Sequence, residues 1–113
     1  MPVTKYPIIT LSIVAAALVL ENRMVDQDGN YSTAATAGFG LTTEDAPAIG
    51  SQVGVDVLGT SIGEAGAAIA KNALLEVGAN GQLVTLAVGV AVARAMQSAG
   101  AAGDKLEVFL LPK

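Results

Sequence analysis

The side chains that could do chemistry in this sequence are carboxylates, lysines and two tyrosines, because its 113 residues include neither cysteine nor histidine. Disulfides, thiolate nucleophiles, imidazole-based triads and metal sites with Cys or His ligands are therefore excluded. Glu44 and Asp45 are the only adjacent acidic pair. Two carboxylates can act as acid and base where their surroundings separate their pKa values. These two lie in a polar segment beside Pro47, which favours a solvated turn, and we expect no enzyme.

A second acidic motif, DQDGN at residues 26–30, resembles the opening of a calcium-binding loop. Such a loop needs glycine at its sixth position and a bidentate glutamate at its twelfth. Counting from Asp26, glycine comes fourth and Ala37 is twelfth. The spacing therefore predicts a hairpin turn and no metal site. No glycine-rich segment has the full spacing of a nucleotide-binding loop, so no cofactor is expected.

Composition limits the classes of partner. Six basic residues against ten acidic ones give a net charge of −4, which is too few cations for the basic face of a nucleic-acid-binding protein. Hydrophobic residues make up 52% of the chain and charged residues 14%, so the chain can bury enough apolar surface to fold. Its length fits one domain, whose core must be built from Ala, Val, Leu and Ile, because aromatic residues are only 4%.

Turn signals recur at short intervals along the chain, and the runs between them are rich in Val, Ile, Leu and Thr. This spacing predicts an all-β fold, a small barrel or sandwich. Alternating patterns predict strands at residues 84–92, 53–57 and 106–110, and Asn80-Gly81 predicts a tight hairpin. Two alanine-rich segments, 64–73 and 91–99, leave open one short helical turn each.

The N-terminal apolar run, Ile8–Leu20, is shorter than the roughly 20 residues of a membrane-spanning helix. Its alternation of apolar and polar residues predicts a buried first strand, and no membrane contact is expected. Two alternatives remain open. Residues 1–14 are an extended arm that could instead add to the sheet of a neighbouring subunit, with residues 15–113 as a single β domain. The segment Ile8–Ala17 could also be a signal peptide.

The chain contains an internal duplication. Residues 20–33 resemble residues 70–85, residues 38–41 align with 89–92, and residues 49–57 align with 102–110. The common order is a hairpin, a strand, a glycine break and an alternating strand. The pattern predicts two similar halves, about 16–58 and 67–111, that close on one core.

The segment from Gly89, GVAVARAMQSAGAAGDKLEVFLLP, resembles the C-terminal signature of small bacteriophage capsid cement proteins, also called head decoration proteins. The upstream segment GFGLTTEDAPAIGSQVGVDVLG is similar to the first-half equivalent of that signature. The resemblance covers about residues 15–112. It implies a compact β-rich domain without catalysis, made in the host cytoplasm, that binds the outer surface of the capsid, often as trimers.

On this interpretation the partners are the major capsid protein and further copies of the chain, with a trimer favoured. Placement along the chain suggests contact residues in the arm and in one polar loop: Val3, Thr4, Lys5, Tyr6, Pro7, Ile8, Ile9, Thr42, Thr43, Glu44, Asp45, Ala46, Pro47, Ala48 and Ile49. The rival interpretation is an exported β-domain that binds a ligand or a cell surface.

Overall fold

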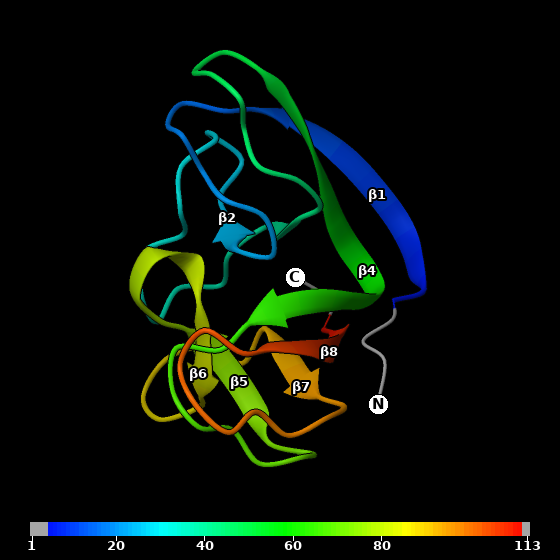
Figure 1. The fold of residues 1–113 in the computed structure, drawn as a ribbon, viewed down its shortest axis with the longest axis vertical. Coiled ribbons are helices and arrows are strands. Elements are labelled where there is room, and N and C mark those ends of the chain that lie inside the picture. Colours follow the sequence, from blue (N-terminus) through cyan, green and yellow to red (C-terminus); the bar gives the residue numbers. More distant parts are fainter. Residues whose placement is uncertain (1–4, 112–113) are drawn as a thin grey trace.

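The computed structural model describes residues 5–111. Within them, eight strands form one strongly curved sheet, a nearly closed barrel, which confirms the all-β prediction (Figure 1). The sheet order is β2-β3-β4-β8-β7-β5-β6, and β1 pairs with β4 outside this path. The strands are β1 (Pro7–Val14), β2 (Met24–Val25), β3 (Gly40–Thr42), β4 (Gln52–Glu64), β5 (Leu74–Val77), β6 (Leu83–Thr85), β7 (Ala93–Ala95) and β8 (Lys105–Leu110), and the 3-10 turn η1 spans Ala79–Gly81.

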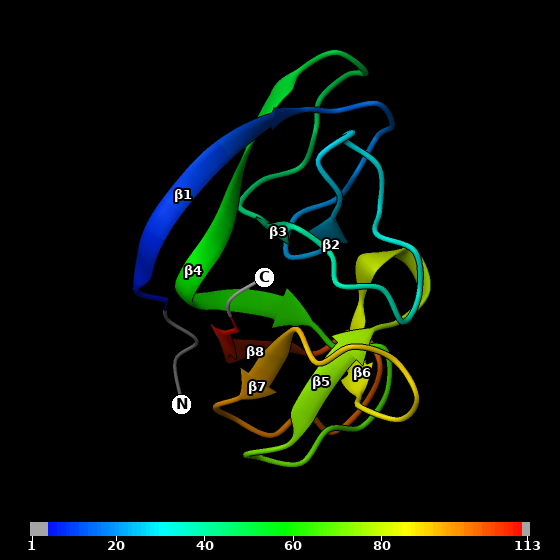
Figure 2. The same ribbon diagram turned by 180° about the vertical axis from the view of Figure 1, so that it is seen from behind.

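The molecule has two lobes that share strand β4. The first half consists of β1, β2, β3 and residues 52–57 of β4, and the second half of residues 58–64 of β4 with β5 to β8 (Figure 2). Strand β4 is 13 residues long and bends near Gly59, whose φ of +93° is in the region that favours glycine. Its early residues pair with β1 and β3, and its later residues pair with β8.

Strand register confirms that the two halves repeat one plan. Met24 pairs with Leu41 and Leu41 with Asp56, while Leu74 pairs with Arg94 and Arg94 with Phe109. In the same way, the pair Ser12 and Gly54 corresponds to Ile62 and Glu107. Even the left-handed asparagines repeat, since Asn22 and Asn72 have φ values of 60° and 73°. The predicted alignment is right at its two ends and wrong by two residues at 38–41, because Gly40 corresponds to Ala93 and not to Ala91.

Two hydrophobic clusters fill the halves, rather than the one core that the sequence predicts. The first-half cluster is small and contains Ile13, Ala15, Val19, Val25, Ala46, Val53 and Val55. The larger cluster is built from β5, β7 and β8 and also takes in Met24 and Leu41 from the first half. Val25 of β2 thus packs in the first-half cluster, while Met24 of β2 and Leu41 of β3 pack in the larger cluster. Strands β2 and β3 therefore connect the two lobes.

Three local predictions need correction. Strands β5 and β6 do form a hairpin, but Val77 pairs with Leu83, so the connection has five residues and contains η1 instead of a tight two-residue turn. The strand predicted at 84–92 ends at Thr85. Beyond Thr85 the Ala87 amide donates to the Glu76 carboxylate at 2.9 Å, and a Cβ at Gly89 would lie 2.0 Å from the other oxygen of this carboxylate, so the backbone here packs against the Glu76 side chain. Neither 64–73 nor 91–99 contains a helical turn.

The first strand is correctly predicted as a strand of its own domain, but the prediction that it is buried is wrong. Strand β1 pairs with β4 from Pro7 to Val14. Only Ile13 among its eight residues is buried. An alternation of apolar and polar residues shows that a segment is an extended strand, but it does not show whether other parts of the protein cover the faces of that strand. Here nothing within the described residues covers most of β1.

Candidate interaction surface

Strand β1 is fastened to the barrel by the buried carboxylate of Asp56. The Lys5 ammonium lies 2.9 Å from Asp56 Oδ2, and the hydroxyls of Thr10 and Ser61 donate to the same carboxylate at 2.8 and 2.6 Å. Asp56 is almost fully buried. A buried carboxylate is costly unless it is paired and hydrogen-bonded, and these three donors meet that need. Two of them come from the N-terminal segment, so the carboxylate fixes that segment against β4.

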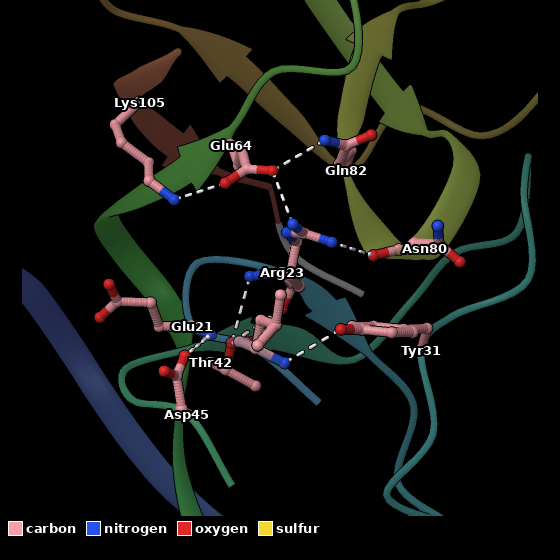
Figure 3. Close-up of polar contacts among 10 residues, drawn as sticks. Glu21, Arg23, Tyr31, Thr42, Asp45, Glu64, Asn80, Gln82 and Lys105 are labelled. Carbon is pink, nitrogen blue, oxygen red and sulfur yellow. Dashed lines mark hydrogen bonds and ion pairs between the residues drawn. The ribbon is translucent and has the colours of Figure 1, made fainter. Parts of the chain in front are cut away.

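A second polar cluster joins the two halves around Glu64 at the end of β4 (Figure 3). Arg23, which precedes β2, places its guanidinium 2.7 Å from Glu64 Oε2, and Gln82 donates to the same oxygen at 2.7 Å. Lys105 of β8 pairs with the other oxygen. Burial alone would raise the pKa of Glu64, but the hydrogen bonds from Lys105 and Gln82 and the charge of Arg23 outweigh it and lower this pKa.

The predicted contact residues of the arm are mostly exposed, with one exception. Val3 and Thr4 lie outside the described residues. Lys5 is committed to Asp56. Tyr6 and Ile8 are exposed by 74% and 72%, and Pro7 and Ile9 are also exposed. This segment therefore offers an apolar surface at the start of β1.

The loop Thr42–Ile49 is only partly available for contact. Thr42 is buried, and its hydroxyl donates to the Leu20 carbonyl at 2.7 Å. Ala46 is also buried, and its amide donates to the Val19 carbonyl. Both residues are structural in this chain, contrary to the prediction. Thr43 is half-buried, while Glu44, Asp45, Pro47, Ala48 and Ile49 are exposed.

The arm and the loop do not form one site. Pro7 pairs near the middle of β4, at Gly59, whereas Val14 pairs at its start, at Gln52, close to the loop. An eight-residue strand is on the order of 25 Å long, so the two predicted segments lie at opposite ends of β1. Ile49 lies beside β1, where it lines a shallow groove together with Leu11.

The exposed apolar residues that sequence reasoning missed are found on both halves: Leu11, Val14, Leu18 and Leu20 in the first, and Val88, Val90, Met96 and Phe109 in the second. Scattered exposed apolar residues are ordinary on a protein surface. The exposed apolar residues of β1 are different, because they border the groove of about 650 Å³ that Leu11, Ile13, Phe39 and Ile49 line. The low charge content of residues 6–20 is the sequence feature that could have predicted this exposed apolar surface.

The groups considered for catalysis lie apart from this groove. Asp45 accepts a hydrogen bond from the Glu21 amide at 2.7 Å, and Glu44 is exposed beside it. Within residues 5–111, no group of three or more Asp or Glu side chains is placed to hold a metal ion. The described part of the chain also has no helix with the length and hydropathy to cross a membrane.

Comparison with known proteins reveals a likeness to a solved structure. No family model matches the sequence, and no curated protein matches it. A solved structure, the N base of the head fiber protein gp8.5 of bacteriophage phi29, superposes with a TM-score of 0.77 at 18% sequence identity. The superposition covers 91% of this chain and 93% of that chain.

This chain thus has the fold of a bacteriophage virion protein over nearly its whole length. At 18% identity the likeness establishes the fold alone. The predicted resemblance to a phage virion protein is confirmed at that level. Membership of the narrower cement family stays a prediction.

Proposed function

We propose that this protein is a structural component of a bacteriophage virion that binds the outer surface of the head and stabilises the lattice by bridging major capsid subunits. The observation that carries the proposal is the fold shared with the N base of the phi29 head fiber, since it extends over 91% of this chain. A fold by itself can host many functions. Here it agrees with the independent resemblance of the C-terminal segment to capsid cement proteins.

Surface chemistry supports a role in binding other proteins. Large apolar side chains are exposed on both lobes, and β1 carries no charged residue between Pro7 and Val14. Depletion of charge is the compositional mark of the centre of a protein interface. A protein that binds only the mature lattice stabilises it by its binding free energy, and many copies multiply the effect.

The arrangement of polar groups also favours a structural role over catalysis. The two buried carboxylates that hold cations, Asp56 and Glu64, are saturated by partners from several strands. They fasten segments together and leave no site for a substrate at either carboxylate. We therefore expect no turnover from Glu44 and Asp45.

The test is to purify particles from the source lysate on a density gradient and to quantify this chain against the major capsid protein by mass spectrometry. A fixed stoichiometric ratio in washed particles would support a decoration role across the lattice, and surface labelling of intact particles would support the outer face. Absence of the chain from washed particles would overturn the proposal.

The rival function, an exported binding domain, requires removal of a signal peptide within Ile8–Ala17. That cleavage would remove β1 and with it the Thr10 hydroxyl that donates to buried Asp56. Sequencing the N-terminus of the mature protein separates the two functions, because a start near Leu18 would favour export.

A further inference from the structure

The two halves of the barrel differ in how their equivalent faces are covered. In the first half, Met24, Leu41 and Asp56 are cross-strand neighbours and form a row, here called the first row. All three are almost completely buried. Met24 and Leu41 enter the cluster of the second half, so the second half covers these two residues of the first row.

The equivalent row on the second half has no such cover. Leu74, Arg94 and Phe109 are its members, here called the second row, and they pair across β5, β7 and β8 in the same register. Leu74 is half-buried, Arg94 is exposed and Phe109 is 49% exposed. Burial in the two rows is the reverse of what side-chain polarity would predict. The buried first row contains the charged Asp56, whereas the more exposed second row contains Phe109, one of the two phenylalanines of the chain.

The surface that receives the first row also has an equivalent, which lies at the groove beside β1. Gly63, Ala65 and Val92 lie where the second half meets Leu41: a Cβ at Gly63 would be 3.7 Å from Leu41 Cδ1, and Ala65 and Val92 share its buried cluster. Strand register makes Ile13 the first-half counterpart of Gly63. Equivalent backbone hydrogen bonds make Ala15 the counterpart of Ala65, and Phe39 the counterpart of Val92. The three counterparts line the groove beside β1, where Ile13 and Ala15 are buried and Phe39 is half-buried.

We propose that the second row of one copy of this chain docks into the β1 groove of another copy, repeating between molecules the contact that joins the two halves within each molecule. The occupant of the groove is thus a second copy. The contact is head-to-tail, because its two sides are different surfaces. Contacts of this kind close into a ring or extend into a filament, and the trimer expected from the sequence is one closed form.

Charge agrees with this pairing. Arg94 is the cation of the second row, and Asp28 lies exposed at the wall of the groove. The Arg94 guanidinium donates to the Asn72 carbonyl at 2.9 Å, which holds the side chain along the second row. Strand β1 adds no charge between Pro7 and Val14, so it does not repel the apolar part of the row. The inference concerns the protein by itself and goes beyond a role on the virion.

The experiment measures the mass of the full chain in solution by size-exclusion chromatography with light scattering. We expect the unmodified protein to be an oligomer. Leu11→Asp damages the groove and Phe109→Asp damages the second row, and each should reduce the mass to that of the monomer. Val88→Asp is the matched control: Val88 is 96% exposed and lies outside both surfaces, and its substitution should leave the mass unchanged.

Mixing the two damaged variants gives the decisive result. The Leu11→Asp chain keeps an intact second row, and the Phe109→Asp chain keeps an intact groove, so an equimolar mixture should form a dimer that grows no further. Formation of this dimer also demonstrates that both variants are folded. A mixture that stays monomeric, a monomeric unmodified protein, or an oligomer that survives Phe109→Asp would overturn the proposal.

Discussion

The ion cluster around Glu64 makes a quantitative prediction about stability. Glu64→Gln keeps the size and the hydrogen-bonding reach of the side chain but removes its charge. The Arg23 and Lys105 cations then lose their partner, and Arg23 is 12% exposed with an Nε that has no hydrogen-bond partner. Breaking a buried pair by removing one partner costs about 3 kcal/mol. For a domain of this size that corresponds to a fall in Tm of about 12 °C.

The pH dependence of this loss provides the more specific assay. The pKa of Glu64 is lowered in the folded protein, so its charged form contributes stability that is present above its ordinary value of 4.5. That contribution disappears as the pH falls through the folded pKa, because a protonated glutamate resembles glutamine. Thermal unfolding followed by circular dichroism should therefore give a larger difference between the two proteins at pH 7 than near pH 3.

Glu44→Gln is the matched control, because Glu44 is exposed and should show almost no change in Tm at either pH. A deficit for Glu64→Gln below about 1 kcal/mol would contradict the reasoning, since this is the worth of an ordinary surface pair. A deficit that is equal at pH 7 and pH 3 would also contradict it, because the loss would then not come from the charge.

Three further substitutions test other parts of the fold. Asp56→Asn should cost about 2 kcal/mol by weakening a buried charge-assisted network, and hydrogen exchange should become faster in the amides of β1 than in those of β8. Gly89→Ala should cost about 2 kcal/mol in denaturant unfolding by overpacking, whereas Gly100→Ala, where the nearest atom is 3.6 Å away, should be near neutral. Leu41→Ala should cost about 3 kcal/mol in the same assay; a loss no larger than that of the exposed Ile49→Ala would refute its place in the buried cluster.

Local patterns in the sequence predict the strands that lie fully within the barrel. Residues 53–57 and 106–110 alternate strictly, and their apolar positions are largely buried in β4 and β8. The duplication is also readable, because glycine, asparagine and apolar positions recur in one order. These features depend on neighbours a few residues apart, and this is the range over which sequence patterns carry information.

Burial and surface position could not be predicted in the same way. The buried Thr42 hydroxyl donates to the distant Leu20 carbonyl, and the backbone that follows Thr85 is bound by Glu76 of the preceding strand. The Glu64 cluster unites residues more than 80 positions apart in sequence, from Arg23 to Lys105. No short motif marks such a cluster, since each of its members reads singly as a surface residue.

The sharing of β4 between the lobes has a consequence for how the protein unfolds. Residues 52–57 complete the first half and residues 58–64 begin the second, so no point along the chain separates two intact units. A proteolytic cut or a circular permutation opened within this strand would disrupt both clusters at once. Although the protein has two clusters, it should therefore melt in a single calorimetric transition, with an enthalpy equal to the van't Hoff value.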